Sequence, residues 1–353
     1  MSYFRKQLDL IAGYQPGEQP QNGHYIKLNT NENPYPPSPL VVETLMENLR
    51  KHRLSYYPSP LCDELREQAS NVYGYPSNWI LVGNGSDELL SIVFRAFLGK
   101  GDRVLYPYPT YTLYRVLALL QEAINEEIPF EKDYSIPEKV LTGQAQLKVV
   151  CNPNSPTGTF LTTPEIENLL QNSNCPVVVD EAYVDFACDN ALSLLKRYSH
   201  LIILRTLSKS FSLAGIRVGF LIAHPEMIQD LLKIKDSYNV SWFSQKAATA
   251  ALQDLHYMKN NVEKIKQTRR EFSRAMIELG YEVLPSEANF VMVRKPGENL
   301  ESEYLYLKKN WILVRYFPEY PDSLRISIGT DSDMQFLIHV LKNMSKDNNK
   351  NGI

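Results

Sequence analysis

From about residue 60 onward, short apolar segments alternate with longer stretches that have helical periodicity. Segments that are apolar at nearly every position are typical of strands buried on both faces of a parallel sheet. Helices between such strands cover those faces, which predicts an α/β fold with a mainly parallel, helix-flanked sheet. We expect its strands at residues 79–82, 103–106, 147–151, 177–179, 201–205 and 217–223.

Helical periodicity is clearest close to the first of these strands. It covers residues 61–73 and 86–98, where Ser86 is expected as the N-cap of the second helix and Gly99 as its stop signal. A long region at 225–279, rich in Lys, Glu, Gln and Ala, is also expected to be helical.

The two ends of the chain differ from the alternating region. The first 60 residues hold eight of the 22 prolines, a content that excludes regular helix and central strand. We therefore expect an extended arm at 1–39, a short helix near 40–51, a large domain at 40–250, a smaller α+β domain at 251–345 and a polar tail at 346–353. The smaller domain is expected to contain strands at 290–294, 312–315 and 324–328 and helices at 301–309 and 331–343.

Charge and composition exclude several classes of protein. The net charge of −3 comes from 37 basic and 40 acidic residues mixed along the chain, so no basic block predicts nucleic-acid binding. The N-terminus lacks the apolar stretch of a signal peptide, and no apolar run approaches the ~20 residues of a membrane span. Four cysteines without CxxC spacing predict neither disulfides nor a structural metal site. We expect a cytoplasmic protein without metal.

The loops that follow the predicted strands carry the chemistry. Ligands of open parallel sheets bind beyond the carboxyl ends of the strands, so these loops are expected to meet at one edge. In chain order they offer two glycines before a helix, aromatic rings, amides, a carboxylate and a lysine. The loops lie at residues 83–88, 107–111, 152–158, 180–183 and 206–209.

The first loop is a candidate phosphate cradle. Gly83 and Gly85 stand before a predicted helix, whose N–H groups and dipole attract an anion. The loop lacks the Gly-Lys-Ser/Thr of a P-loop and the complete GxGxxG of a dinucleotide site. A plain tight turn capped by Ser86 is the alternative.

Three charged residues in these loops each have two interpretations. Asp180 could bind a metal, orient a histidine or hold a protonated ring nitrogen, or it could only cap a helix. Lys209 could be an amine nucleophile if it is partly dehydrated, or an ordinary surface lysine. Arg217 could clamp an anion or lie on the surface. A phosphate site, a carboxylate, aromatic rings and a lysine at one edge together match the requirements of pyridoxal 5′-phosphate.

Four segments carry a resemblance to a known family. They read AGYQPG at 12–17, LNTNENPY at 28–35, TLSKSFSLAGIRVG at 206–219 and LRISIG at 324–329. The chain resembles the fold-type I aminotransferases and, within them, the histidinol-phosphate aminotransferase family, nearly from end to end. The third segment is the most specific match.

The resemblance implies a role for each matching residue. Lys209 would carry pyridoxal 5′-phosphate, Asp180 would pair with its protonated ring nitrogen, Tyr183 would bond its phenolic oxygen and Tyr111 would stack on its ring. Tyr57 would reach the phosphate from a neighbouring subunit, which implies a homodimer with composite sites. The phosphate would otherwise be held by the backbone of Gly85, Ser86 and Asp87 and by Ser208 and Arg217.

One position departs from the family pattern. Ser155 stands where the family commonly has an asparagine that donates to the phenolic oxygen of the cofactor. Either Ser155 or the neighbouring Asn154 would take over that contact, so the departure concerns tuning of the cofactor rather than the reaction.

The resemblance also implies a substrate class. Arg325, with Arg315 and Tyr14, would clamp the phosphate of histidinol phosphate and afterwards the carboxylate of 2-oxoglutarate, because a guanidinium suits either anion. The alternatives are an aromatic or broad-specificity aminotransferase, a phosphothreonine-type decarboxylase, a cofactor-binding regulator of transcription and an inactive paralogue.

Overall fold

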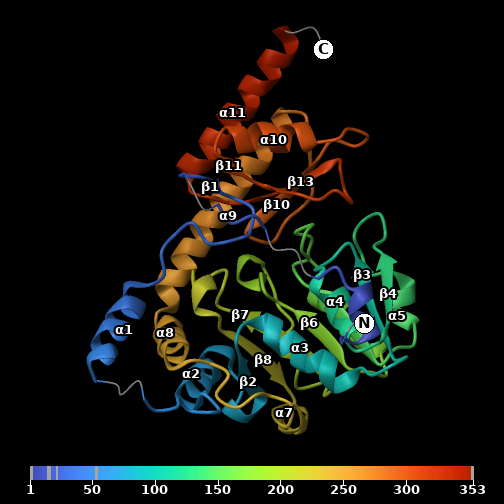
Figure 1. Cartoon of the computed structure of the whole chain (residues 1–353), viewed down its shortest axis with the longest axis vertical. Helices are drawn as coiled ribbons and strands as arrows, with labels where there is room; N and C mark the ends of the chain where they lie inside the picture. Colours follow the sequence, from blue (N-terminus) through green and yellow to red (C-terminus); the bar gives the residue numbers. More distant parts are fainter. Residues whose placement is uncertain (1–2, 14–16, 21–22, 52–54, 351–353) are drawn as a thin grey trace.

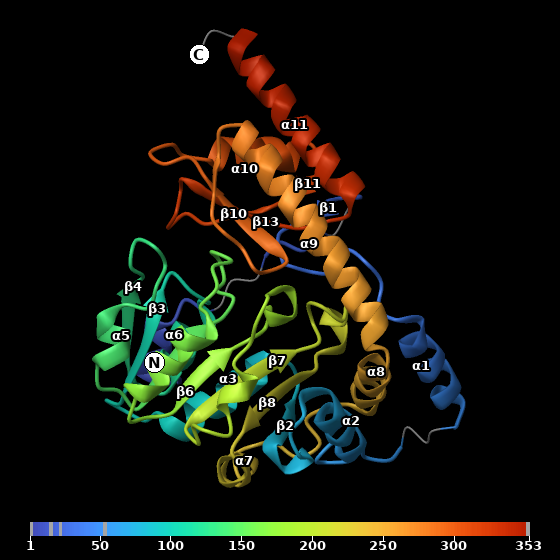
Figure 2. The same cartoon turned by 180° about the vertical axis from the view of Figure 1, so that it is seen from behind.

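A computed structural model describes residues 3–13, 17–20, 23–51 and 55–350. A large sheet flanked by helices forms the lower part of the molecule in Figures 1 and 2, and a smaller sheet with its own helices forms the upper part. The long helix α9 (Leu255–Glu278) leads from the lower part to the upper part. None of the helices in the described ranges is long and apolar enough to cross a membrane.

The large sheet has seven strands in the order β2-β8-β7-β6-β5-β3-β4. All neighbouring pairs are parallel except the two that β8 makes, so the predicted mainly parallel sheet is confirmed. All six expected strands are present, and one more was not expected. The strands are β2 (Ile80–Gly83), β3 (Arg103–Tyr108), β4 (Ile124–Pro129), β5 (Leu147–Cys151), β6 (Val177–Asp180), β7 (Leu201–Thr206) and β8 (Gly219–Ala223).

Strand β4 escaped the sequence analysis because it lies at the edge of the sheet. Its segment INEEIP contains one asparagine and two glutamates, and none of its residues is fully buried. An edge strand needs no apolar side chains on both faces, so it lacks the signal that marks the other strands.

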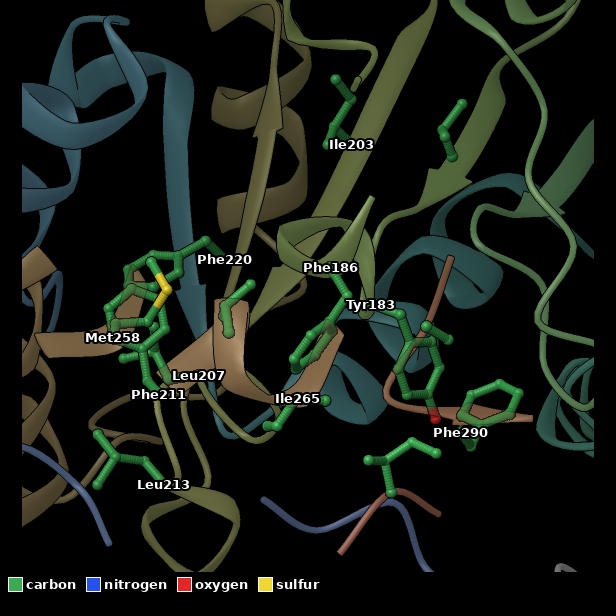
Figure 3. Packing of buried hydrophobic residues seen from close by; sticks show 14 of the residues in the cluster. Tyr183, Phe186, Ile203, Leu207, Phe211, Leu213, Phe220, Met258, Ile265 and Phe290 are labelled. Carbon is green, nitrogen blue, oxygen red and sulfur yellow. The ribbon is translucent and has the colours of Figure 1, made fainter. Parts of the chain in front are cut away.

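The core shows why the central strands are apolar at every position. Val177 and Val179 of β6 belong to one hydrophobic cluster, whereas Val178 belongs to a second cluster. Alternate residues of a strand point to opposite faces, so the sheet is packed on both sides. Figure 3 shows part of the first cluster, in which Phe186, from the segment after β6, and Ile265, from α9, are among the packed residues.

The helices match the expectations with three differences. Ser86 is the first residue of its helix and Gly85 is the N-cap, so the expected N-cap is wrong by one position. The region 225–279 is divided into three helices, and the last helix is longer than expected. The helices are α1 (Pro39–Lys51), α2 (Asp63–Tyr73), α3 (Ser86–Phe97), α4 (Leu113–Leu120), α5 (Glu138–Thr142), α6 (Thr163–Gln171), α7 (Pro225–Leu232), α8 (Trp242–Gln253), α9, α10 (Glu301–Lys309) and α11 (Asp331–Lys350).

The smaller sheet is antiparallel and has the order β12-β13-β10-β9. The segment expected as one strand at 312–315 is divided between β11, which pairs with the N-terminal arm, and β12 of this sheet. A domain boundary near residue 250 stays a prediction. The strands are β9 (Glu282–Val283), β10 (Phe290–Arg294), β11 (Ile312–Leu313), β12 (Arg315–Tyr316) and β13 (Ser323–Ser327).

The N-terminal arm is tied to the smaller sheet. Its strand β1 (Ile26–Lys27) pairs in parallel with β11. The next residue, Leu28, accepts a hydrogen bond on its carbonyl from the Ser327 N–H at 2.9 Å. The arm then runs to α1, which lies beside α8 (Figure 1). On the way, Asn31 bonds to Ser327 of β13 and Thr30 bonds to Lys209 after β7, so this part of the arm passes between the two sheets.

Candidate active site

Most of the predicted site residues meet in one cavity of about 540 Å³ between the two sheets. Strands β3, β5, β6 and β7 are parallel, and β2 runs in the same direction because both β2 and β7 are antiparallel to β8. The loops after these five strands therefore meet at one edge, as the sequence predicts. Eleven of the predicted residues line the cavity: Ser86, Asp87, Tyr111, Ser155, Asp180, Tyr183, Ser208, Lys209, Arg217, Arg315 and Arg325.

One end of the cavity is a cradle of anion-binding groups at the N-terminus of α3. Arg217 donates from Nη2 to Asp87 Oδ2 at 3.1 Å and from Nη1 to Ser208 Oγ at 3.3 Å. Gly85 has φ +85, and a Cβ there would stand 2.5 Å from Arg217 Nη2. The absence of a side chain at Gly85 therefore lets the guanidinium lie against the helix terminus, where N–H groups and the dipole favour an anion.

Asp180 lies at the end of β6, on the floor of the cavity, and is 3% exposed. Tyr114 Oη donates to Asp180 Oδ2 at 2.8 Å. Burial raises the pKa of the Asp180 carboxyl to about 6, although the bond from Tyr114 opposes the shift. A cation placed against this carboxylate would offset the cost of burial and lower its pKa.

Lys209 follows β7 and points toward the arm. Its Nζ donates to the carbonyl oxygen of Thr30 at 3.2 Å and stands 5.5 Å from the centre of the Tyr183 ring. Burial and the charges of Arg325 and Arg217 lower the pKa of the Lys209 amine to about 8, against the attraction of nearby carboxylates. A larger fraction of this amine is therefore uncharged near neutral pH than for an exposed lysine.

Two arginines reach the cavity from the smaller sheet. Arg315 of β12 is paired directly with Arg325 of β13. Each guanidinium lies over the ring of Phe317, at 5.3 Å and 5.6 Å from its centre. Arg325 also donates to Ser155 Oγ at 3.1 Å and to the carbonyl of Asn29 at 2.9 Å. Two cationic groups thus lie on the side of the cavity that the smaller sheet provides.

Ser155 and Asn154, the two residues that could replace the asparagine of the family pattern, have different surroundings. Ser155 lines the cavity and accepts a hydrogen bond from Arg325. Asn154 is 2% exposed and bonds to Pro109, Thr110 and Thr157 within and beside its own loop. Of the two, Ser155 is placed to contact a ligand.

Three predicted site residues lie away from the cavity lining or outside the described ranges. Gly85 stands behind the lining, against Arg217. Tyr57 is 79% exposed and stacks on Tyr238 with the ring centres 4.5 Å apart, so it lies outside the cavity of its own chain. Tyr14 lies outside the described residues.

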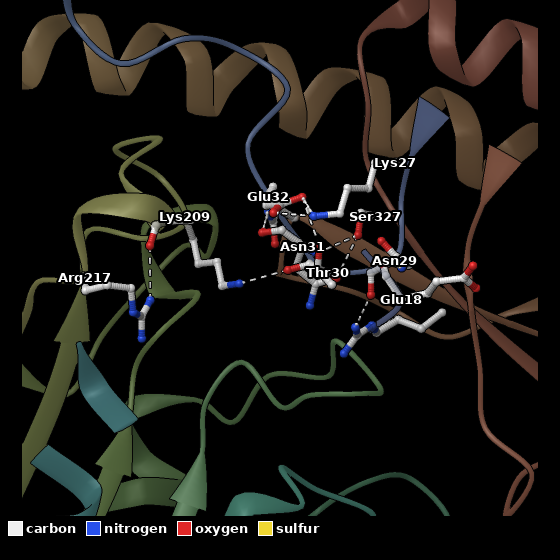
Figure 4. A network of polar contacts seen from close by, with 12 residues as sticks. Glu18, Lys27, Asn29, Thr30, Asn31, Glu32, Lys209, Arg217 and Ser327 are labelled. Atoms are coloured by element: carbon white, nitrogen blue, oxygen red, sulfur yellow. Dashed lines mark hydrogen bonds and ion pairs between the residues drawn. The ribbon is translucent and has the colours of Figure 1, made fainter. Parts of the chain in front are cut away.

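Sequence reasoning missed several residues of the site. Thr30 and Asn31 come from the arm. The carbonyl of Thr30 accepts from Lys209 (Figure 4), and Asn31 donates to Tyr183. Tyr108 and Tyr320 form a wall of the cavity, with their ring centres 5.9 Å apart. The three asparagines at positions 29, 31 and 33 were the available signal for the arm, because buried amides need partners.

No cluster of three or more His, Cys, Asp or Glu side chains suited to a metal ion occurs within the described ranges.

Comparison with known proteins gives both a family and a fold. Residues 23–341 match the family described as aminotransferase class I and II. The chain is 45% identical to the histidinol-phosphate aminotransferase of Rhodopirellula baltica over 336 residues, 94% of this chain and 92% of that protein. It is 42% identical to histidinol-phosphate aminotransferase 1 of Trichormus variabilis over 347 residues, 97% of this chain and 99% of that protein.

A solved structure has the same fold. It is a histidinol-phosphate aminotransferase from Sinorhizobium meliloti in complex with pyridoxal-5′-phosphate, with a TM-score of 0.88 and 23% identity. The alignment covers 98% of this chain and 99% of that one. Both sheets of the present chain therefore belong to one known architecture.

Proposed function

The chain belongs to the histidinol-phosphate aminotransferase family of the class I and II aminotransferases, and from this premise we propose the reaction that it catalyses. It transfers the amino group of histidinol phosphate to 2-oxoglutarate with the help of pyridoxal 5′-phosphate. The products are imidazole acetol phosphate and glutamate, which places the reaction in histidine biosynthesis. The observation that carries the choice of substrate is the pair Arg315 and Arg325 on the cavity, opposite a separate anion cradle.

The donor set of the cavity fits the cofactor. The α3 N-terminus, Ser208 and Arg217 form a cradle for its phosphate, and Gly85 leaves the space that the cradle needs. The buried carboxylate of Asp180 would pair with a protonated ring nitrogen, an interaction that also favours the charged form of Asp180. Bound pyridoxal 5′-phosphate supplies an electron sink that allows a proton to leave the amine-bearing carbon of the substrate.

Lys209 has two tasks in this proposal, one as the residue that holds the cofactor and one as a base. Its lowered pKa of about 8 makes the uncharged amine available for both. With the cofactor bound, the uncharged Nζ would be the base that takes the proton from the substrate carbon that bears the amino group. The Thr30 carbonyl, 3.2 Å away, fixes the direction of Nζ.

Arg315 and Arg325 bind the anionic end of each substrate in turn. Their spacing around Phe317 gives two cationic groups and an aromatic face on one wall. A guanidinium binds phosphate or carboxylate through parallel hydrogen bonds, so one clamp serves histidinol phosphate and then 2-oxoglutarate. Tyr108 and Tyr320 offer ring faces for the imidazole.

A homodimer with composite sites is part of the proposal. Tyr57 is exposed beside Tyr238, and helix α1 leaves Val42, Met46 and Leu49 exposed at helical spacing. In a twofold dimer each chain offers the same surface to the other, so Tyr57 would complete the cradle of the partner. The cytoplasmic location stays a prediction from the sequence.

A comparison of amino donors tests the proposed substrate. Purified protein with cofactor and 2-oxoglutarate is assayed with histidinol phosphate, phenylalanine and phosphothreonine, and glutamate and carbon dioxide are both measured. We expect the largest kcat/KM for histidinol phosphate and no carbon dioxide from phosphothreonine. A larger kcat/KM for phenylalanine would favour the aromatic or broad-specificity enzyme, and carbon dioxide release would favour the decarboxylase.

A further inference from the structure

A short piece of the arm, residues 29–33, contacts three residues of the proposed catalytic site. The carbonyl of Asn29 accepts from Arg325, the carbonyl of Thr30 accepts from Lys209, and Asn31 donates to Tyr183. Figure 4 shows this piece between Lys209 on one side and Ser327 of the smaller sheet on the other. Of the three contacts, the one from Asn31 is made by a side chain and can be altered by substitution.

The hydrogen bonds around Asn31 fix which end of its side chain faces Tyr183. Ser327 Oγ accepts a hydrogen bond from the backbone N–H of Asn31 at 2.9 Å. The hydroxyl proton of Ser327 is therefore donated to a different atom, Asn31 Oδ1, also at 2.9 Å. Oδ1 is therefore the acceptor, and Nδ2 faces Tyr183 Oη at 3.0 Å. The carbonyl of Asn31 accepts from Asn289 Nδ2 at 3.0 Å, which holds the residue from a fourth direction.

The backbone of Asn31 suits this position. Its φ of +56 lies in the left-handed region, which asparagine adopts more readily than most residues. The side chain is 1% exposed, and both of its polar atoms have partners. Asn31 is therefore held in one orientation, with an N–H aimed at the phenol.

The bond from Asn31 determines what the Tyr183 hydroxyl can do. A phenol has one proton, and an oxygen that accepts a hydrogen bond becomes a better donor through that proton. The Tyr183 ring is fixed against Phe290, with centres 5.0 Å apart and nearly perpendicular planes (Figure 3). With one side of Oη occupied by Asn31, the proton is directed toward the cavity that Tyr183 lines.

The charged and titratable groups around Tyr183 come from three parts of the structure: Arg325 of β13, Lys209 after β7 and the Cys151 thiol of β5. The uncharged hydroxyl of Ser155, in the loop after β5, also hydrogen-bonds to Tyr183. Burial raises the pKa of Tyr183 to about 12 even though Arg325 lowers it. Tyr183 therefore keeps its proton at neutral pH and acts as a donor.

We propose that Asn31 is a positioning residue that orients the Tyr183 hydroxyl toward the phenolic oxygen of the bound cofactor and so controls the acidity of the lysine-linked cofactor. The inference rests on the proposed function, because it requires pyridoxal 5′-phosphate on Lys209. A hydrogen bond to the phenolic oxygen stabilises its negative charge most when the linked nitrogen has lost its proton. Weakening the bond therefore raises the pKa of the linked nitrogen.

The test is a pH titration of the visible absorbance of the bound cofactor in wild-type protein and in Asn31→Gly, a substitution that tolerates φ +56. We expect the pKa of the cofactor to rise by about 0.5 unit, the scale set by one neutral hydrogen bond. Tyr183→Phe raises it further. In the Tyr183→Phe background, we expect Asn31→Gly to add no further shift in the pKa of the cofactor. If Asn31 only stabilised the fold, its substitution would shift this pKa with or without the Tyr183 hydroxyl.

Asn289→Ala is the matched control, because it also removes one hydrogen bond to Asn31 but leaves its side chain facing Tyr183. We expect its cofactor pKa to equal that of wild type. Asn31→Asp serves if Asn31→Gly does not fold, because it keeps an acceptor for Ser327 and removes the donor to Tyr183. Its carboxylate also raises the pKa of the cofactor through its charge alone. The readout is therefore the difference between the shift with Tyr183 present and the shift in the Tyr183→Phe background, and we expect the shift to be larger with Tyr183 present.

The outcomes separate the inference from the proposed function. Wild-type protein that binds no cofactor on Lys209 would overturn the proposed function. Normal binding with no shift in Asn31→Gly, or a shift that persists in the Tyr183→Phe background, would overturn the inference alone.

Discussion

At the scale of single residues, the site depends on side chains whose ionisation is altered by burial. The amine of Lys209 has a pKa lowered to about 8, whereas the carboxyl of Asp180 has a pKa raised to about 6. Burial disfavours the charged form in both cases, and so the two shifts have opposite signs. Such pairs of oppositely shifted groups are typical of sites that hold and move protons.

The pKa of Lys209 predicts how attachment of the cofactor depends on pH. The uncharged amine is the nucleophile, so in cofactor-free protein the attachment rate should rise with pH and level off above a midpoint near 8. Stopped-flow absorbance after mixing with pyridoxal 5′-phosphate measures this rate. A midpoint near the ordinary lysine value of about 10.4 would contradict the description of the site.

Two arginine variants control this measurement. Arg325 is a like charge that lowers the pKa of Lys209, so Arg325→Ala should move the midpoint to higher pH. Arg294, on the same small sheet, pairs with Asp322 and does not line the cavity. Arg294→Ala should therefore leave the midpoint unchanged.

Residues that follow a strand were predictable from the sequence, and residues that depend on distant contacts were not. Asp180 is the last residue of the apolar strand β6 and Lys209 lies in the loop after the apolar strand β7, so their meeting follows from the direction of the strands. Asn31 reaches Tyr183 across a sequence separation of 152 residues, which no local pattern records. The place of Tyr57 depends on a second chain and stays a prediction.

At the scale of elements, the approach of α3 to β8 creates the cradle. A Cβ on Gly219, the first residue of β8, would stand 2.6 Å from the Ser86 N–H nitrogen. Two glycines, Gly85 and Gly219, therefore allow the helix terminus, the strand and Arg217 to lie within contact distance. Gly85 was predictable as part of a turn before a helix, but its contact with Arg217 was not, because that contact joins segments that are far apart in the sequence.

Gly85→Ala tests the geometry of the cradle. The new Cβ would displace Arg217 Nη2 and would also force alanine into φ +85. Loss of charge-assisted bonds to the phosphate should weaken cofactor binding by about tenfold or more. Equilibrium titration of cofactor-free protein measures the dissociation constant.

Gly101→Ala is the control for backbone strain. Gly101 has φ +84, and nothing lies within 4 Å of a Cβ placed there. We expect a similar loss of stability on thermal unfolding but an unchanged dissociation constant for the cofactor. Equal weakening of cofactor binding in both variants would show that strain alone accounts for the effect.

At the scale of the whole molecule, the arm connects the two sheets. Strand β1 pairs with β11, and the residues after it bond to Ser327 of the small sheet and to Lys209 of the large one. The α/β class and most strands were predictable from periodicity, which is a local property. The connection through the arm was not, because a proline-rich segment has no periodic signal. We propose the boundaries 40–250 and 251–345 for the two domains.

Mixing of inactive chains tests the composite dimer. Tyr57→Ala should weaken a site in the partner, and Lys209→Ala should inactivate its own site. Exchange of subunits between the two variants gives mixed dimers with one complete site each, so about a quarter of wild-type activity should return if half the dimers are mixed. Activity that stays at the level of the separate variants would contradict composite sites.

Amino transfer itself is measured by following ¹⁵N from labelled histidinol phosphate to 2-oxoglutarate with the purified protein and its cofactor. Mass spectrometry of the products follows the label, with Lys209→Ala assayed beside the wild type. We expect ¹⁵N-glutamate from the wild type and none from Lys209→Ala. If the wild-type protein forms no ¹⁵N-glutamate, or if Lys209→Ala transfers the label equally well, the chain does not catalyse this transfer through Lys209.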